Sequence, residues 1–302
     1  GKFRIGFFIW NCEKKEHFKY EIGEVYDRNG NFIESKGAFG IDSLKELTNY
    51  WIKEFSKNLE EGEKIGILAC STPDYQHNNE VNISLTKGKG HISFILINRI
   101  NLIPALIYFS IRLCIDANED NDRDQFLYPN DGWQTDTEFQ SDCLAYTLFH
   151  GQNRISSKEG INHWIPFTEQ EVDAPERFAS NFMTDFIKGK IKPTEEEHQK
   201  IFNQDNLNLI PSAPLVFSSE AQAVFDAGRE LWRYYMKQEN SNPNASLYNI
   251  REHFQGRNDK GKMNNNSSDE TYTQLISKLR EVLKVLAEKI TPKVFEYGFL
   301  RK

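Results

Sequence analysis

Cysteine is scarce in this sequence and is never paired at short spacing. The four cysteines among the 302 residues, Cys12, Cys70, Cys114 and Cys143, lie far apart, with no Cys-x-x-Cys pair. This pattern provides neither a disulfide framework nor a zinc or redox motif. Three of the four lie in apolar runs, where buried reduced thiols are usually found. We therefore expect a cytoplasmic protein.

The sequence also lacks a long uninterrupted apolar run. Its longest apolar stretch, residues 92–115, is broken by two asparagines, two arginines and a proline. A membrane-spanning helix needs about 20 consecutive residues that are mostly apolar. We therefore expect no membrane segment.

The motifs of several enzyme classes are absent. The sequence contains no P-loop, no GxGxxG loop, no G-x-S-x-G serine elbow and no HExxH zinc motif. The acidic stretch 116–124 has no glycine at the sixth position of a calcium loop and no glutamate at the twelfth, so the EF-hand interpretation fails. His150 or His163 could act as a base in a hydrolase, but a structural histidine is the simpler interpretation.

Excess positive charge is absent as well. The chain has 37 lysines and arginines against 44 acidic residues, which gives a formal net charge of -7. A nucleic-acid-binding surface must therefore be a local basic patch, because the protein as a whole does not attract a polyanion.

Aromatic residues are abundant, at 13% of the chain, and many of them lie in the stretch 121–167. There they alternate with charged and amide residues, and outside 139–149 they follow no helical or strand period. Aromatic and polar side chains gathered on loops favour a binding surface. The alternative is a long, well-packed connection within a large domain.

The pattern of elements predicts an α+β fold, with a mixed sheet and hairpins in the first half and a mainly helical last third. Phe3–Trp10 is a strand that is apolar on both faces, and Asn29-Gly30 between the following strands is a hairpin signal. Strands 81–85 and 91–97 are joined by a short glycine-lysine turn, and the polar stretch from 195 is a candidate boundary. Thr168 and Glu171 predict a capping box before a helix that runs past Pro175. Further helices are expected to begin near Asp136, at Ser218 or Ser219, at Ser246 and at Asp269. We divide the chain into closing strands of a larger sheet (1–37), an α/β recognition-type region (38–194) and a helical C-terminal region (195–302).

Several local groups of basic, amide and aromatic residues are candidates for contact with nucleic acid. Lysines contact phosphates, arginine and amide side chains read base edges, and aromatic rings stack on unpaired bases. The candidate residues are Lys87, Lys89, Arg123, Asn130, Trp133, Gln152, Asn153, Arg154, Lys188 and Lys190.

Several segments of the sequence resemble those of a known protein family. IGFFIWN followed by EVYDRNGNFIESK resembles the late strands of N6-adenine DNA methyltransferases of restriction-modification systems. Later segments, including NDRDQFLYPNDGW, LAYTLFHGQNRISS, FDAGRELWRYY and PKVFEYGFL, resemble the C-terminal part of large bacterial members. The resemblance implies a parent enzyme that is adenine-specific, uses S-adenosylmethionine and acts on double-stranded DNA.

Two catalytic motifs of this family are missing, which limits what the resemblance implies. The FxGxG-type loop that binds S-adenosylmethionine is absent, and so is the Asn/Asp-Pro-Pro-Tyr/Phe tetrapeptide that holds the target adenine. We therefore expect a fragment that follows the catalytic motifs, with no catalytic residue and no cofactor of its own. Its expected role is target recognition or DNA contact. The alternative is a scaffold that docks onto the catalytic methyltransferase half or a partner subunit.

Overall fold

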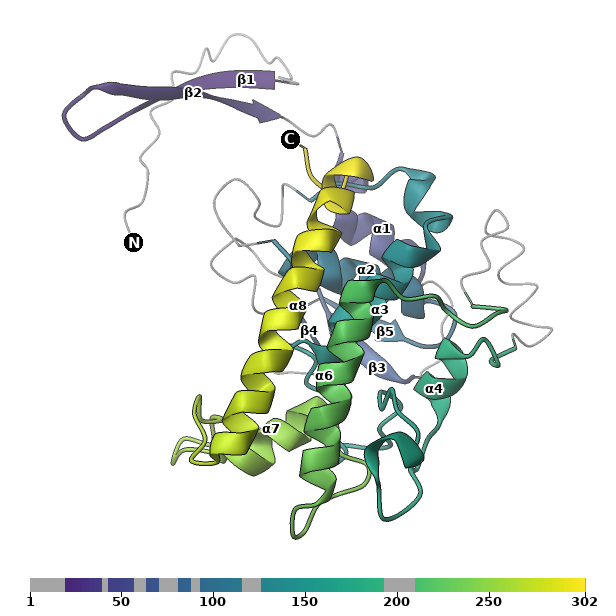
Figure 1. The fold of residues 1–302 in the computed structure, drawn as a ribbon. Coiled ribbons are helices and arrows are strands. Elements are labelled where there is room, and N and C mark those ends of the chain that lie inside the picture. The colour runs from purple at the N-terminus through teal and green to yellow at the C-terminus, as the bar shows by residue number, and fades with distance from the viewer. Residues whose placement is uncertain are drawn as a thin grey trace. The chain divides into compact units, whose positions relative to one another are not determined.

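The computed structural model describes residues 20–39, 43–56, 64–70, 81–87, 93–115, 126–192 and 210–301 (Figure 1). The chain divides into two compact units, Gly1–Glu46 and Leu47–Lys302. The expected strand Phe3–Trp10 lies outside the described residues.

The first unit contains the predicted hairpin. Strands β1 (Tyr20–Tyr26) and β2 (Phe32–Phe39) pair antiparallel, with a bulge next to Tyr26. The Asp27 carboxylate accepts hydrogen bonds from the backbone N–H groups of Asn29 and Asn31, both at 2.8 Å, and Gly30 has a φ of 81°. The turn therefore forms for the local reasons that its sequence indicates, since an aspartate caps the turn and a glycine takes the left-handed conformation.

The second unit contains a three-stranded antiparallel sheet in the order β4-β3-β5. Its strands are β3 (Gly66–Ala69), β4 (Asn82–Ser84) and β5 (Phe94–Ile97). The glycine-lysine segment after β4 was expected to join two neighbouring strands, but this expectation is wrong because β3 lies between β4 and β5. All four residues of β3 are buried, as expected for a central strand that is covered on both faces.

The helices of this unit begin largely where capping residues predict them. They are α1 (Thr48–Glu54), α2 (Leu102–Leu113), α3 (Thr137–Phe149), α4 (Phe182–Ile187), α6 (Ser219–Met236), α7 (Leu247–Gln255) and α8 (Glu270–Glu296). Four N-cap side chains accept a hydrogen bond from the first turn of their helix, as short polar side chains do at this position. These caps are Asp136, Ser218, Ser246 and Asp269.

One predicted helix is much shorter than expected. Thr168 and Glu171 form the predicted capping box, in which the Glu171 carboxylate accepts from the Thr168 N–H and hydroxyl at 2.8 Å each. Only a 3-10 turn follows, Gln170–Val172, because Asp173 adopts a left-handed conformation with a φ of 54°. The chain re-enters a helix only at α4.

The α+β prediction is confirmed, with small antiparallel sheets in the first half and helices in the last third. α6 and α8 lie side by side and run in opposite directions, and α3 contacts both of them as well as α2 (Figure 1). Helices from the regions 38–194 and 195–302 therefore contribute to one core. No helix in the described ranges has the length and apolar character needed to cross a membrane.

The aromatic stretch 121–167 proves to be part of the core, so the expectation of an exposed aromatic surface is wrong for the residues that the structure describes. Seven of its aromatic side chains are at most 3% exposed, and only Tyr128 is substantially exposed, at 41%. Trp164 covers the sheet at Gly66 and donates from its indole N–H to the Ile65 carbonyl at 2.9 Å. The seven are Phe126, Trp133, Phe139, Tyr146, Phe149, Trp164 and Phe167. The stretch is thus the well-packed connection that was the alternative.

A buried carboxylate at the junction of α3, α6 and α8 makes stability depend on pH. Asp142 is 2% exposed, accepts a hydrogen bond from the Ser218 hydroxyl at 2.6 Å, and lies 3.9 Å from the Lys289 ammonium. Glu138 and Glu220 share that ammonium, at 2.8 and 3.5 Å. Burial raises the pKa of Asp142 to about 6. The native state therefore binds a proton that the unfolded state has already released, and stability falls as the pH rises through the interval between the two pKa values.

We expect Asp142→Asn to stabilise the protein by about 2 kcal/mol at pH 8 and by almost nothing near pH 4, because the amide removes the cost of burying a charge. Urea unfolding at the two pH values measures the difference. Glu138→Gln is the matched control, because Glu138 contacts the same lysine but its side chain is 57% exposed, and its effect should stay below about 0.5 kcal/mol. A gain for Asp142→Asn that is equal at both pH values would contradict the explanation.

Candidate anion-binding site

The turn that follows α3 is held against the free edge of the sheet. The Ile83 N–H donates to the Gln152 carbonyl at 3.1 Å, and the Arg154 N–H donates to the Ile83 carbonyl at 2.7 Å. Ile83 and Asn153 form a parallel bridge. Residues 152–154 therefore continue the sheet beyond β4, and the position of the turn is fixed by backbone hydrogen bonds.

Helix α7 is fixed to the chain that follows this turn. The Asn249 side-chain oxygen accepts from the Ser157 N–H at 3.0 Å and from the Ser246 N–H at 3.2 Å, while its amide donates to the Ser156 hydroxyl at 3.1 Å. The Ser246 hydroxyl also donates to the Ile155 carbonyl. This capping box thus serves two purposes, since it starts α7 and it sets the helix at a defined place beside the turn.

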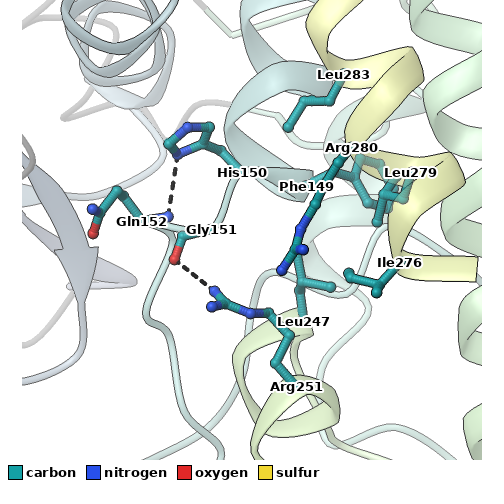
Figure 2. Close-up of a pocket in the computed structure, with 10 residues that line it drawn as sticks. All are labelled: Phe149, His150, Gly151, Gln152, Leu247, Arg251, Ile276, Leu279, Arg280 and Leu283. Carbon is teal, nitrogen blue, oxygen red and sulfur yellow. Dashed lines mark hydrogen bonds between the residues drawn. The ribbon is translucent and has the colours of Figure 1, made fainter. Parts of the chain in front are cut away.

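A hollow of about 320 Å³ lies where the turn, α7 and α8 meet (Figure 2). Arg251 enters it from α7 and Arg280 from α8, and the Arg251 guanidinium donates to the Gly151 carbonyl at 3.0 Å. Most of the other lining residues are apolar, and His150 and Gln152 add neutral polar groups. The complete lining is Phe149, His150, Gly151, Gln152, Leu247, Arg251, Ile276, Leu279, Arg280 and Leu283.

The positive charge at this hollow is not neutralised by any carboxylate in the described parts of the chain. Arg251 bonds only neutral acceptors, the Gly151 carbonyl and the Gln255 side chain. Arg154 donates to the side-chain oxygen of Gln152 at 3.0 and 2.7 Å. Among the residues that the structure describes, Arg280 has no ion-pair partner, and neither has its exposed neighbour one turn along α8, Lys284.

The charges of these arginines act on one another and on the nearby histidine. Burial is the largest cause that lowers the pKa of Arg251; the nearby Tyr272 and Tyr248 raise it, and the positive charges of Arg280 and Arg154 lower it. Such repulsion between like charges has a free-energy cost, which a bound anion removes. The site is therefore arranged to accept negative charge.

His150 is neutral at physiological pH. Its ring packs against Phe109 and Tyr146, with centroid distances of 5.4 and 5.0 Å. Burial and the charge of Arg251 lower the pKa of His150 to about 4. The Gln152 N–H donates to Nδ1 at 3.1 Å, so the ring hydrogen of the neutral form is on Nε2.

The lining gives no support to a hydrolase built on His150. A catalytic base of that kind needs a carboxylate to orient it, and the residues around the hollow include arginines but no aspartate or glutamate. The second histidine considered, His163, shares a hydrogen bond of 2.7 Å with the Ser180 hydroxyl.

Three of the predicted nucleic-acid-binding residues have structural partners. Trp133 is 1% exposed and packs edge to face on Trp51. Asn153 is 5% exposed and donates to the Thr147 carbonyl. Asn130 caps the turn Asp131–Gln134 and donates to the Glu296 carbonyl at 3.1 Å. We therefore leave these three out of the candidate surface.

The remaining predicted residues fall into separate groups. Gln152 lines the hollow and accepts hydrogen bonds from Arg154, whereas Lys188 lines a second pocket that shares no residue with the hollow. Lys87 and Lys190 are exposed elsewhere. Lys89 and Arg123 lie outside the described residues.

The sequence reasoning missed Arg251 and Arg280. Both lie about a hundred residues or more from the turn that they join, and each occupies the polar side of an amphipathic helix, where charged residues are usually just solvated. The one available signal was the position of Arg280 beside the apolar stripe Ile276, Leu279 and Leu283, which places it at the border of the buried face.

The described residues contain no group of three or more histidine, cysteine or acidic side chains that could hold a metal ion. Comparisons with protein-family models, with curated proteins and with solved structures found no match for this chain.

Proposed function

We propose that this chain is the DNA-contacting, target-recognition portion of an S-adenosylmethionine-dependent N6-adenine DNA methyltransferase of a restriction-modification system, and that it is not catalytic by itself. The observation that supports it is the meeting of Arg251 and Arg280 at one hollow, with Arg154 bonded to Gln152 of its lining and with no carboxylate partner for the three arginines in the described ranges. In a protein with a net charge of -7, such a group marks a local surface for a polyanion.

The parent enzyme and its cofactor enter this proposal through the family resemblance. Methyl transfer would be carried out by a catalytic half that holds S-adenosylmethionine and the target adenine. The present chain would supply contacts to the DNA phosphates. A cytoplasmic location is part of the proposal, and the three cysteines that the structure describes, Cys70, Cys114 and Cys143, are all free thiols.

We expect the protein to bind duplex DNA weakly at low salt, and we expect Arg280→Ala to weaken that binding about three- to tenfold. Each phosphate contact contributes about 0.9 to the slope of log K against log salt, so the variant should lower the slope by about one. Fluorescence anisotropy titrations from about 20 to 200 mM salt measure both quantities.

Lys278→Ala is the matched control for this test. Lys278 lies on the same helix and carries the same charge, but its ammonium already pairs with Glu230 at 2.7 Å. Its loss should change neither the affinity nor the slope by more than the experimental error. A flat titration of the unaltered protein at low salt would count against DNA contact altogether.

The second candidate function is a scaffold that docks onto the catalytic half. It is favoured by the hairpin of the first unit, where four large apolar side chains are more than half exposed within the described part of the chain. These are Ile22, Tyr26, Phe32 and Ile33. Exposed apolar groups of this kind are typical of interaction sites. Mixing this chain with the polypeptide that carries the catalytic motifs separates the two functions, since docking without DNA affinity supports the scaffold.

A further inference from the structure

The hollow beside the turn is concave, whereas contact with a duplex backbone requires only an exposed positive surface. Arg251 enters it from α7 and Arg280 from α8, and Leu247, Ile276 and Leu279 line it beside them (Figure 2). Its volume of about 320 Å³ is at the small end of the range for small-molecule sites. A duplex backbone can reach Arg280, which is exposed at the surface, whereas only the end of a molecule can fill the concave space inside.

The free hydrogen-bond donors of the hollow exceed what a phosphodiester can use. A guanidinium has five N–H donors. Arg251 uses one at Nη1 for Gly151 and one at Nε for Gln255, which leaves three, and no residue in the described ranges accepts from Arg280. A phosphodiester offers one charge and two terminal oxygens. A phosphomonoester offers a charge of about −1.5 to −2 at pH 7 and three terminal oxygens.

We propose that the hollow binds a phosphomonoester group, carried either by a free nucleotide or by the 5′-phosphorylated end of a DNA strand. The two guanidinium groups bind the phosphate, and the apolar lining residues contact the carbon atoms of the sugar and base. The DNA end rests on the proposed function, whereas the free nucleotide does not.

The pH dependence separates this site from one that depends on histidine. An arginine guanidinium stays charged between pH 5 and 8, and Tyr272, whose pKa burial raises, carries no charge in that range. His150 stays neutral throughout, because burial and Arg251 lower its pKa to about 4. The described lining holds no carboxylate and no histidine other than His150, so the group that titrates between pH 7.5 and pH 5 is the ligand, whose second pKa is about 6. Binding should therefore weaken between pH 7.5 and pH 5, whereas a site that relied on a protonated histidine would bind more tightly.

Isothermal titration calorimetry with deoxyadenosine monophosphate, deoxyadenosine and inorganic phosphate tests the proposal. We expect the monophosphate to bind, phosphate alone to bind more weakly, and the nucleoside not to bind. Arg280→Ala should weaken the monophosphate about tenfold or more, because hydrogen bonds to charged groups contribute strongly. Lys278→Ala should leave its affinity within about twofold, because that lysine is paired with Glu230.

Circular dichroism of Arg280→Ala establishes that this exposed substitution leaves the fold intact, so a loss of affinity can be assigned to the site. Absence of monophosphate binding up to about 10 mM would overturn the proposal, and so would binding that Arg280→Ala leaves unchanged.

A pair of otherwise identical duplexes, one with 5′-phosphate and one with 5′-hydroxyl ends, identifies the source of the phosphate. Tighter binding of the phosphorylated duplex, reversed by free monophosphate, assigns the hollow to a DNA end. Equal binding of the two duplexes, together with no monophosphate binding by calorimetry, overturns the phosphomonoester proposal and leaves DNA contact standing. Monophosphate binding without any duplex binding supports the free nucleotide and removes the proposed function.

Discussion

Replacing Gly228 by alanine is expected to destabilise the protein by about 2 to 3 kcal/mol. Gly228 lies within α6, and a Cβ atom built on it would be 2.2 Å from Cε1 of Phe149. In an ordinary helix the same change stabilises by about 1 kcal/mol, because alanine has the higher helix propensity. The sign is reversed here because the ring of Phe149 occupies the space that the methyl group needs.

The Phe149 ring cannot move aside at low cost. It is 2% exposed and packs edge to face on Phe225 and Trp232, with centroid distances of 5.3 and 6.0 Å. A shift of the ring would displace those neighbours, since protein interiors are packed as tightly as organic crystals. Phe149 also lines the hollow, so the substitution should weaken ligand binding there as well.

Urea unfolding of Gly228→Ala measures the effect, and two further variants interpret it. Glu230→Ala, at an exposed position of the same helix, controls for the substitution itself and should change stability by less than about 0.5 kcal/mol. Phe149→Leu combined with Gly228→Ala should be more stable than the sum of the single changes predicts, since the smaller side chain leaves room for the methyl group. Unchanged stability of Gly228→Ala would mean that α6 and Phe149 are not this close.

The sequence allowed the prediction of those parts of the fold that depend on local chemistry. The N-caps Asp136, Ser218, Ser246 and Asp269 each have their hydrogen-bond partner within three residues, so their helices could be predicted without knowing the tertiary structure. The Asp27 turn is of the same kind.

Features that depend on distant residues could not be predicted in the same way. The placement of β3 between β4 and β5 requires pairing across the chain, and no local signal distinguishes it from a β4-β5 hairpin. The capping box of Thr168 was correct, but the left-handed Asp173 that ends its turn could not be inferred from the helical spacing of apolar residues.

Only the part of the candidate site that belongs to the turn after α3 could be predicted from the sequence. Gln152 and Arg154 were identified because amide and arginine side chains are of the types that read base edges. Their partners Arg251 and Arg280 come from two other helices, and the Asn249 network that places α7 beside the turn joins residues more than ninety positions apart. A single sequence does not reveal that side chains so far apart along the chain lie close together in space.

The aromatic stretch was misjudged for a related physical reason. A loop has no regular period, so alternation of apolar and polar residues cannot indicate which side chains are buried. Burial of Trp133 depends on Trp51 and Phe55 at α1, which lie far from it along the chain. The contacts that bury the aromatic side chains therefore involve residues outside the stretch, and its own sequence pattern does not reveal them.

Trp133→Ala is expected to destabilise the protein by about 3 to 5 kcal/mol, the cost of removing a large aromatic side chain from a core. Trp133 is 1% exposed and packs edge to face on Trp51 and Phe55, at centroid distances of 5.4 and 6.0 Å. Trp51 in turn contacts Phe299, so the loss would loosen the packing between α1 and the end of the chain. Thermal and urea unfolding of the variant measure this loss of stability.

The control for Trp133 lies in the same segment. Tyr128 is 41% exposed and donates to Glu54 at 2.6 Å, so Tyr128→Ala should cost no more than about 1 kcal/mol. Trp133→Phe should retain more than half of the lost stability, because a ring still fills most of the space. A Trp133→Ala protein that is as stable as the unaltered chain but no longer binds DNA would restore a stacking role for this residue. Loss of stability with unchanged DNA affinity per folded molecule assigns Trp133 to the core, which is the outcome that its burial requires.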